Sequence, residues 1–423
     1  MRRIAIVLGA LVAFSAPAKA ETIFIQAGHV ITDASQPARG ASTITITDGR
    51  ITSIVDGLVR TEPGAKVIDL TARTVLPGLI DAHVHLTSTP GGDFRQDAVE
   101  SNEWAVIVGA KNALTTARAG FTTVRDLGSA PLTGFALRDG TAKGFIPGPR
   151  ILSAGTAISI IGGHGDVSGF RPEVNAALDV GNTCTGPDQC AARVREAMKR
   201  GADVIKITAT GGVLSQSDKG LGQHFTDAEM KAIVDTAHGL GLKVAAHAHG
   251  ARGVEAAARA GVDSIEHGTF ADAAAIKVMK ANGTSLVPTL MAFTGIRERV
   301  GKGIYTPIVD AKVRMTLAEV GKALKAARAA GVPIVFGTDA GVYEHGRNAE
   351  EFAQMVTLGG LTPAEALASA TTGAATLLDL EGEVGRIAPG YSADMIAVDG
   401  DPLTDVRVLE KVKFVMVRGR VIE

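Results

Sequence analysis

Short runs of β-branched and apolar residues mark both ends of the chain. They occupy residues 23–25, 43–46, 51–55, 395–398 and 412–417. These runs alternate or cluster as strands do, and aspartate-glycine pairs typical of turns follow the runs at 43–46 and 395–398. Because the two ends share a pattern that the middle lacks, we predict one small β-sandwich domain built from residues 21–77 and 385–423.

The middle of the chain alternates apolar strands with alanine-rich helical stretches. Helices are predicted at residues 100–119, 191–200, 227–239, 250–260, 272–281, 317–330 and 349–357. Strands are predicted to end at His85, at Arg125-Asp126, near Ser153, at Lys206, at His247, at His267, near Thr289 and at Asp339. Eight strands alternating with helices predict an α/β fold, a (β/α)8 TIM barrel over residues 78–384.

The composition is consistent with a large hydrophobic core and argues against nucleic acid as a binding partner. The chain has 423 residues, 46% of them hydrophobic, so disorder is excluded as the main state. A formal net charge of −1 argues against a nucleic-acid-binding protein, which normally needs a basic face.

The N-terminus has the pattern of a bacterial secretory signal peptide over residues 1–20. Arg2 and Arg3 precede an apolar run that ends in small residues, and we predict cleavage after Ala20. The mature protein would then be secreted or periplasmic, with no membrane segment, since no later stretch resembles a span. A buried N-terminal helix or strand is the alternative.

The two cysteines, Cys184 and Cys190, are too few for a disulfide scaffold or a four-cysteine zinc site. In an oxidising compartment they could close one small loop. Two free thiols are the alternative, and the spacing alone does not decide between them.

The strongest local signal is a pair of histidines, His83 and His85, at the end of a predicted strand. Residues two apart in a strand point to the same face, and imidazoles suit zinc and similar metals. Taken by itself, this pair would also be explained by two unrelated polar contacts, without a metal ion. However, further strands end on residues of the same kind, namely Lys206, His247, His267 and Asp339. Barrel enzymes keep their chemistry at these C-terminal strand ends.

The order His-x-His, Lys, His, His, Asp, together with Gly-Arg-Ile-Ala-Pro-Gly at 385–390, resembles the amidohydrolase superfamily. The segments at 124–128, 162–166 and 345–351 narrow the resemblance to the imidazolonepropionase-related group of metal-dependent Xaa-Pro dipeptidases and carboxypeptidases. Related sequences in this group are associated with Xaa-Pro substrates, basic C-terminal residues and phenylalanine amides such as ochratoxin A.

This resemblance implies two divalent metal ions, with zinc as the default. The first takes His83, His85 and Asp339, and the second takes His247 and His267. A buried lysine prefers to be neutral, so Lys206 can add carbon dioxide, and its carbamate would bridge the metals. A structural salt bridge of Lys206 is the alternative. A hydroxide held between the metals would attack the amide, and Asp339 would pass its proton to the leaving nitrogen.

Four further residues are predicted to contact substrate: His164, His249, Arg125 and His224. His164 is also predicted to be catalytic, through a contact to the substrate carbonyl or carboxylate, with a loop hydrogen bond as its alternative. His249 would share the strand face of His247. Arg125 would anchor a carboxylate or pair with a neighbouring acid, and His224 would face either the pocket or the solvent.

The sequence therefore predicts a dinuclear-metal amidohydrolase that releases a C-terminal amino acid from a small substrate, a dipeptide or N-acyl amino acid. A cyclic-amide hydrolase or deaminase of the imidazolonepropionase type is an alternative, although those enzymes generally lack the bridging lysine. A periplasmic ligand-binding protein is another, although it usually has two lobes and no such metal cage. Barrels of this kind often form homo-oligomers, and the sequence does not indicate the oligomeric state.

Overall fold

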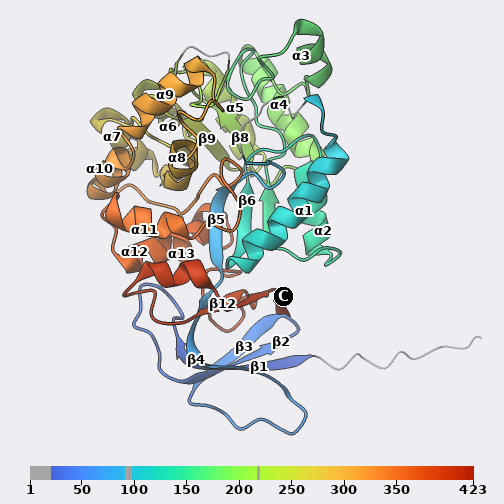
Figure 1. Cartoon of the computed structure of the whole chain (residues 1–423), viewed down its shortest axis with the longest axis vertical. Coiled ribbons are helices and arrows are strands. Elements are labelled where there is room, and N and C mark those ends of the chain that lie inside the picture. The colour runs from blue at the N-terminus through green and yellow to red at the C-terminus, as the bar shows by residue number, and fades with distance from the viewer. Residues whose placement is uncertain (1–20, 91–94, 96–97, 217–219) are drawn as a thin grey trace, which may run out of the picture.

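A β-sheet built from both ends of the chain lies beside a larger part in which helices surround strands (Figure 1). The computed structural model describes residues 21–90, 95, 98–216 and 220–423. The predicted signal peptide, residues 1–20, lies outside the described residues. No helix within the described ranges is both long enough and apolar enough to cross a bilayer.

Seven strands form one sheet in the order β14-β13-β12-β4-β1-β2-β3. Their bounds are β1 Thr22–Val30, β2 Ser42–Thr47, β3 Arg50–Asp56, β4 Lys66–Pro77, β12 Met395–Val398, β13 Phe414–Val417 and β14 Arg420–Val421. The strands predicted for the β-sandwich domain are thus connected into one continuous hydrogen-bonded sheet. The reason is the length of β4, 12 residues, which pairs with β1 over most of its length and with β12 over residues 74–77. Ile25, Ile44, Met395 and Met416 share one buried cluster, so the two chain ends pack together.

The middle of the chain supplies two parallel sheets. One contains β5 (Leu79–Val84), β6 (Phe121–Asp126) and β7 (Arg150–Ser153), and the other β8 (Ile205–Thr208), β9 (Val244–Ala248), β10 (Ser264–His267) and β11 (Ser285–Val287). Single parallel bridges join them: Ile158 pairs with Ile207 beside β8, and residues 334 and 340 pair with β11 and β5. The parallel pairings therefore run from β5 through all these strands and back to β5.

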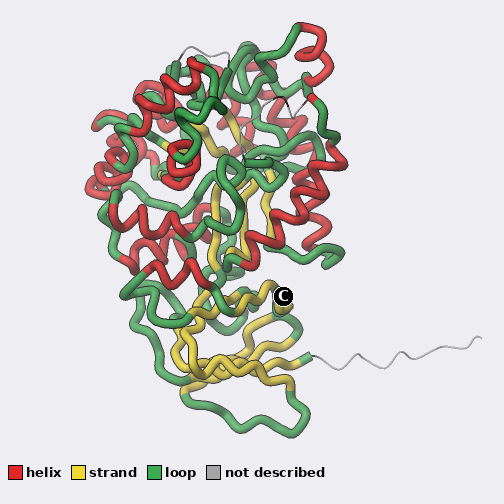
Figure 2. The backbone as a smooth tube through the Cα atoms, in the orientation of Figure 1, coloured by secondary structure: helices red, strands yellow, loops and turns green. Residues whose placement is uncertain are grey.

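Helices lie around these strands (Figure 2). They are α1 Asn102–Arg118, α2 Thr133–Ala142, α3 Pro172–Leu178, α4 Pro187–Arg200, α5 Asp227–Gly239, α6 Ala251–Ala260, α7 Ala273–Asn282, α8 Leu290–Arg297, α9 Pro307–Leu317, α10 Lys322–Ala330, α11 Glu350–Thr357, α12 Pro363–Ser369 and α13 Thr372–Leu377. The bounds of α5 match the prediction, because Thr226 and Glu229 form a capping box at its start. The predicted helix at 317–330 begins only at Lys322, as α10, because Gly321 directly before it has a φ of 82° that favours glycine.

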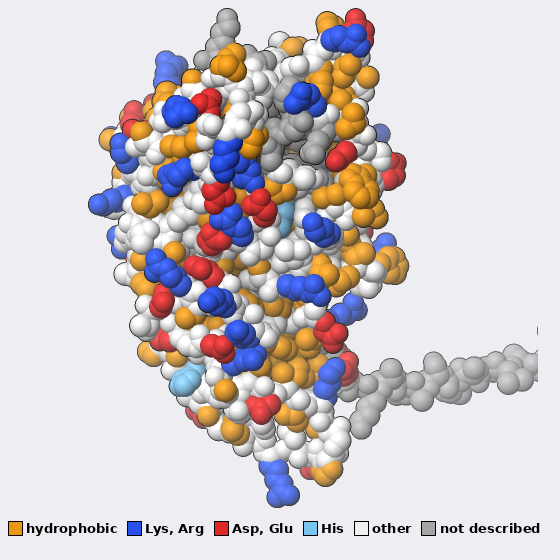
Figure 3. Space-filling model, in the orientation of Figure 1, with side chains coloured by type: hydrophobic (Ala, Val, Ile, Leu, Met, Phe, Trp, Pro, Cys, Tyr) orange, Lys and Arg blue, Asp and Glu red, His pale blue; other side chains and the backbone are white. Residues whose placement is uncertain are grey.

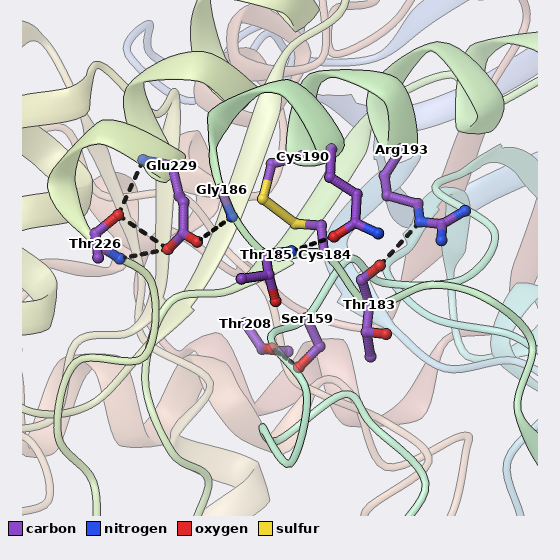
Figure 4. The surroundings of a disulfide bond; sticks show 11 residues. Ser159, Thr183, Cys184, Thr185, Gly186, Cys190, Arg193, Thr208, Thr226 and Glu229 are labelled. Atoms are coloured by element: carbon purple, nitrogen blue, oxygen red, sulfur yellow. Dashed lines mark hydrogen bonds between the residues drawn. A yellow bond between two sulfur atoms is a disulfide. The ribbon is translucent and has the colours of Figure 1, made fainter. Parts of the chain in front are cut away.

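A disulfide joins Cys184 and Cys190, whose Cα atoms lie 5.0 Å apart (Figure 4). Both cysteines are buried. Within the loop, the Gly186 amide donates to Glu229 Oε1 at 2.7 Å, and Glu229 Oε2 accepts from the Thr226 amide at 2.8 Å. The loop closed by the disulfide therefore connects the start of α4 to the start of α5.

Replacing both cysteines, Cys184→Ala with Cys190→Ala, is expected to lower the free energy of unfolding by about 2 kcal/mol, because a short closed loop no longer restricts the unfolded chain. Urea unfolding followed by circular dichroism measures the change. Wild-type protein kept under reductant is the matched control and should show the same loss. Unfolding of the double variant at the urea concentration of the oxidised wild type would contradict this role.

Candidate metal centre

Histidine and aspartate side chains from the strand ends gather into two adjacent groups. One contains His83, His85 and Asp339, and the other contains His247, His249 and His267; within each group the nitrogen and oxygen atoms lie within 4.8 Å of one another. Lys206, on β8, is 4% exposed, and its charge acts on histidines of both groups. The parallel strands bring these residues together because their carboxyl ends meet on one side.

The first group has the donor arrangement of a metal site. Asp339 Oδ1 lies 3.4 Å from His83 Nε2 and 3.2 Å from His85 Nε2. This oxygen is buried and has no hydrogen-bond partner among the described residues. His83 donates through Nδ1 to Glu266 at 2.8 Å, and His85 donates through Nδ1 to the Gly128 carbonyl at 2.9 Å. Both Nε2 atoms are left facing the unsatisfied carboxylate oxygen, which fits a divalent ion held by three ligands.

The second group consists of three imidazoles in contact. The His247 ring centroid lies 4.7 Å from that of His267, and the His249 ring stacks on His267 at 4.8 Å. His267 donates through Nδ1 to Thr289 Oγ1 at 2.6 Å, since that hydroxyl itself donates to the Pro288 carbonyl. His249 Nδ1 lies 2.8 Å from Thr269 Oγ1. His249, predicted as a substrate contact, thus also has the position of a metal ligand.

The backbone at three strand ends adopts the left-handed region. His267, Thr289 and Asp339 have φ angles of 71°, 49° and 61°. Such conformations are unfavourable for residues other than glycine and collect at functional sites. The fold therefore holds these side chains in place at a local cost in backbone energy.

Burial and neighbouring charges set the protonation states that metal binding requires. Burial lowers the pKa of Lys206 to about 8, although the Glu266 and Asp339 carboxylates oppose it. Burial and the Lys206 charge lower the pKa of His83 to about 4, so its ring is neutral at pH 7. Burial alone would raise the pKa of Asp339, but His83 and His85 hold that pKa well below its usual range. Burial also lowers the pKa of His247, His249 and His267, whereas the Asp339 carboxylate raises the pKa of His85. The centre therefore offers an ionised carboxylate and, except at His85, imidazoles whose pKa shifts favour the neutral form that binds metal.

His164 lies at the edge of the second group. Its ring centroid is 4.2 Å from that of His247, and its Nδ1 is 2.6 Å from Ser215 Oγ. Gly212 allows this approach, because a Cβ there would come within 2.2 Å of His164 Nδ1. His224 is half-buried, and its amide donates to the Ala209 carbonyl at 2.8 Å just beyond β8. The structure thus places His164 against a candidate ligand and His224 in the adjoining loop.

Arg125 is not placed where the sequence predicted. Its side chain is 1% exposed and donates to the Ala82 carbonyl at 2.6 Å, to Ser264 Oγ at 3.2 Å and to Glu266 Oε1 at 2.9 Å. A guanidinium enclosed by these acceptors cannot reach a substrate carboxylate. The predicted substrate-anchoring role is therefore wrong, and the alternative, pairing with an acid, is the one observed.

Glu266 is the residue of the centre that sequence reasoning missed. Strand alternation assigns neighbours 266 and 267 to opposite faces, yet both contact His83: Glu266 through the 2.8 Å hydrogen bond, and His267 with ring centroids 5.2 Å apart. The left-handed backbone of His267 breaks the alternation. The signal in the sequence is a carboxylate directly before the strand-end histidine, in the strand Ser264–His267.

Comparison with known proteins decides the family. The family model described as "Amidohydrolase family" matches residues 74–422. The chain belongs to the amidohydrolase family. This amidohydrolase is 30% identical over 416 residues to an ochratoxinase of Aspergillus niger, covering 94% of this chain and 85% of that protein. It also resembles the crystal structure of a Xaa-Pro dipeptidase with methionine bound in the active site, with a TM-score of 0.87, 38% identity, and 95% and 99% of the two chains covered.

A third relative lies further away. An imidazolonepropionase of Paracoccus denitrificans is 30% identical over 365 residues, covering 78% of this chain and 80% of that protein. The predicted family and enzyme class, a hydrolase acting on amide or peptide bonds, are thereby confirmed.

Proposed function

We propose that this amidohydrolase uses two divalent metal ions, zinc by default, to hydrolyse an amide or peptide bond to a C-terminal amino acid in a small substrate. The observation that carries the proposal is the pair of adjacent ligand groups with the buried Lys206 acting on both. The ochratoxinase and the methionine-bound Xaa-Pro dipeptidase support this class of substrate. On the face shown in Figure 3, basic and acidic side chains are interspersed, which suits a small substrate better than a polyanion.

The proposed scaffold is a (β/α)8 barrel. Seven strands and the segment at 333–340 are connected by parallel pairings that return to β5. The Phe336 carbonyl accepts from the Ala82 amide at 3.0 Å, and the Ala340 carbonyl accepts from the His85 amide at 2.7 Å, so that segment occupies the place of an eighth strand. The ligand groups then lie at the carboxyl-terminal mouth of the barrel.

Each ligand group would hold one ion: His83, His85 and Asp339 the first, and His247 with His267 the second. Such ions, when bound, supply Lewis-acid polarisation of the scissile carbonyl and lower the pKa of water. Lys206 would contribute a ligand to both ion positions once it is carboxylated. Its amine adds carbon dioxide to form an N–C bond and releases one proton, which leaves an anionic carbamate, and a pKa near 8 keeps an appreciable neutral fraction available.

Asp339 is the proposed proton carrier. Its Oδ1 is buried without a hydrogen-bond partner among the described residues, and its depressed pKa keeps it ionised before reaction. It would accept a proton from the attacking water and deliver it to the leaving amine nitrogen. His249 would act as a further substrate contact or ligand, and His224 as a contact from the loop.

The proposed C-terminal residue is apolar. Phe293, buried on α8, lies edge-on to His249 with ring centroids 6.4 Å apart. Val213 and Leu221 of the adjoining loop are buried with Ile296, Val309 and Val313 from α8 and α9. An apolar cluster beside the ligand groups would favour an apolar substrate side chain over a charged one.

A panel of dipeptides and N-acyl amino acids, incubated with zinc-loaded mature protein, tests the substrate class. We expect release of the C-terminal amino acid, fastest for phenylalanine, methionine or leucine, and slow for lysine or glutamate. Hydrolysis of cyclic amides with no release from any linear amide would instead favour an imidazolonepropionase-like activity, to which the 30% identity lends some support.

Replacing His164 with asparagine is expected to lower kcat about a hundredfold with a small change in KM, because the shorter amide no longer places a donor beside the reacting carbonyl. Steady-state kinetics on the best substrate measure the change. His238→Asn is the matched control, since His238 lies on the surface of α5 and pairs only with Asp263 within the described chain. Equal kinetics of the two variants would contradict the role of His164.

We propose that the protein acts in an oxidising compartment, the periplasm or the exterior, after cleavage following Ala20. The Cys184–Cys190 disulfide supports this location, because such bonds persist under oxidising conditions. N-terminal sequencing of the periplasmic protein should begin at Glu21. Recovery of the whole chain in the reducing cytoplasm would contradict it.

A further inference from the structure

Two oppositely charged side chains lie in the protein interior beneath the first ligand group. Glu266, from β10, is 0% exposed, and Arg125, from β6, is 1% exposed. Arg125 Nη2 donates to Glu266 Oε1 at 2.9 Å, and Ser264 Oγ donates to the same oxygen at 2.5 Å. The other carboxylate oxygen, Oε2, accepts from His83 Nδ1 at 2.8 Å. One carboxylate therefore joins a buried cation to a candidate metal ligand.

This acceptor differs from those of the other candidate ligands. His85 Nδ1 donates to a backbone carbonyl, that of Gly128, while the Nδ1 atoms of His249 and His267 contact the hydroxyls of Thr269 and Thr289. Among these four histidines, only His83 has a carboxylate as the hydrogen-bond partner of Nδ1. A carboxylate acceptor fixes the tautomer of an imidazole and increases the basicity of its other nitrogen more than a neutral oxygen does.

Arg125 makes this arrangement persistent. An isolated buried carboxylate would take up a proton, since burial disfavours its charge. The ion pair with Arg125, with the Ala82 carbonyl and Ser264 holding the rest of the guanidinium, keeps Glu266 charged and fixes its direction. Ala82 precedes His83 on β5, so the same arginine also positions the backbone beside that ligand.

We propose that Glu266, held by Arg125, is a positioning residue that makes the metal position of His83, His85 and Asp339 bind more tightly than the position of His247 and His267. This inference rests on the proposed dinuclear function. A purely structural Arg–Glu pair would require only one carboxylate oxygen and would leave both metal affinities unchanged when it is replaced.

Zinc titration of the metal-free full chain, in competition with a chromophoric chelator, measures the two affinities without reference to activity. Wild-type protein should bind two zinc ions in two distinct steps. Glu266→Gln should weaken the tighter step about 10- to 100-fold and leave the weaker step unchanged. Thr289→Val is the matched variant for the second group, and it should weaken the other step instead.

A second variant tests the proposal if Glu266→Gln does not fold. Glu266→Gln leaves Arg125 buried without its counterion, which destabilises proteins strongly. The double replacement Arg125→Met with Glu266→Gln removes both charges and should fold while still weakening the tighter step by the same factor. A folded Glu266→Gln or double variant with wild-type affinity for both ions would overturn the inference while leaving the proposed function intact. Wild-type protein that binds no zinc would contradict both.

Discussion

Replacing Asp339 with asparagine is expected to abolish hydrolysis, lowering kcat by about a thousandfold or more. The amide keeps the size of the carboxylate but has no charge for a metal ion and cannot accept and return a proton. Because Asp339 Oδ1 is buried between His83 and His85, no other described carboxylate contacts both rings in its place. Steady-state rates with saturating zinc, together with the zinc content of the purified variant, measure the two losses separately.

Asp235→Asn is the matched control for this variant. Asp235 is exposed in the second half of α5, away from the capping box, and pairs with Lys231. Its replacement should leave both rate and zinc content at wild-type values. An Asp339→Asn variant that retained a tenth or more of the wild-type rate would rule out Asp339 as the proton carrier.

Replacing Lys206 with alanine is the second change expected to have a large effect. Loss of the amine removes the group that would be carboxylated between the two ligand groups, so zinc affinity and kcat should both fall about a hundredfold or more. Added short carboxylic acids such as acetate or propionate should restore part of both, because they supply a carboxylate to the space left by the side chain. Zinc titration and rate measurements with and without the acid give the result.

The matched control is Lys231→Ala, which removes an exposed lysine from α5 and should change neither quantity. Reconstitution of wild-type protein with zinc in buffer free of carbon dioxide is an independent test of carboxylation and should slow zinc uptake. If Lys206→Ala bound two zinc ions and retained full activity, a structural role for the lysine would be the better explanation.

The sequence predicted that the metal ligands lie close together, because the carboxyl ends of parallel strands meet on the same side of the sheet. His83, His85, Lys206, His247, His267 and Asp339 were each placed by the apolar run that precedes them, and the pairings of β5 and of β8 to β11 bring those runs into register. The helix at 227–239 was equally predictable, since its capping box is local to the sequence.

Other features depend on contacts between distant segments. Arg125 belongs to β6, whose six residues are all buried, so its position in the sequence did not distinguish the pocket from the interior. Glu266 became part of the centre because the backbone of His267 departs from an extended conformation. The connection of the terminal strands into one sheet likewise depends on how far β4 extends past β1 to pair with β12. The hydrophobic periodicity of the sequence does not indicate that length.

Titration of zinc into the metal-free protein, while release of the C-terminal amino acid from the best substrate is followed, tests the dinuclear centre most directly. The rate should rise until about two zinc ions are bound per chain and then remain constant. Full activity of the metal-free protein in the presence of a chelator, or a plateau at one zinc ion, would contradict the proposed centre.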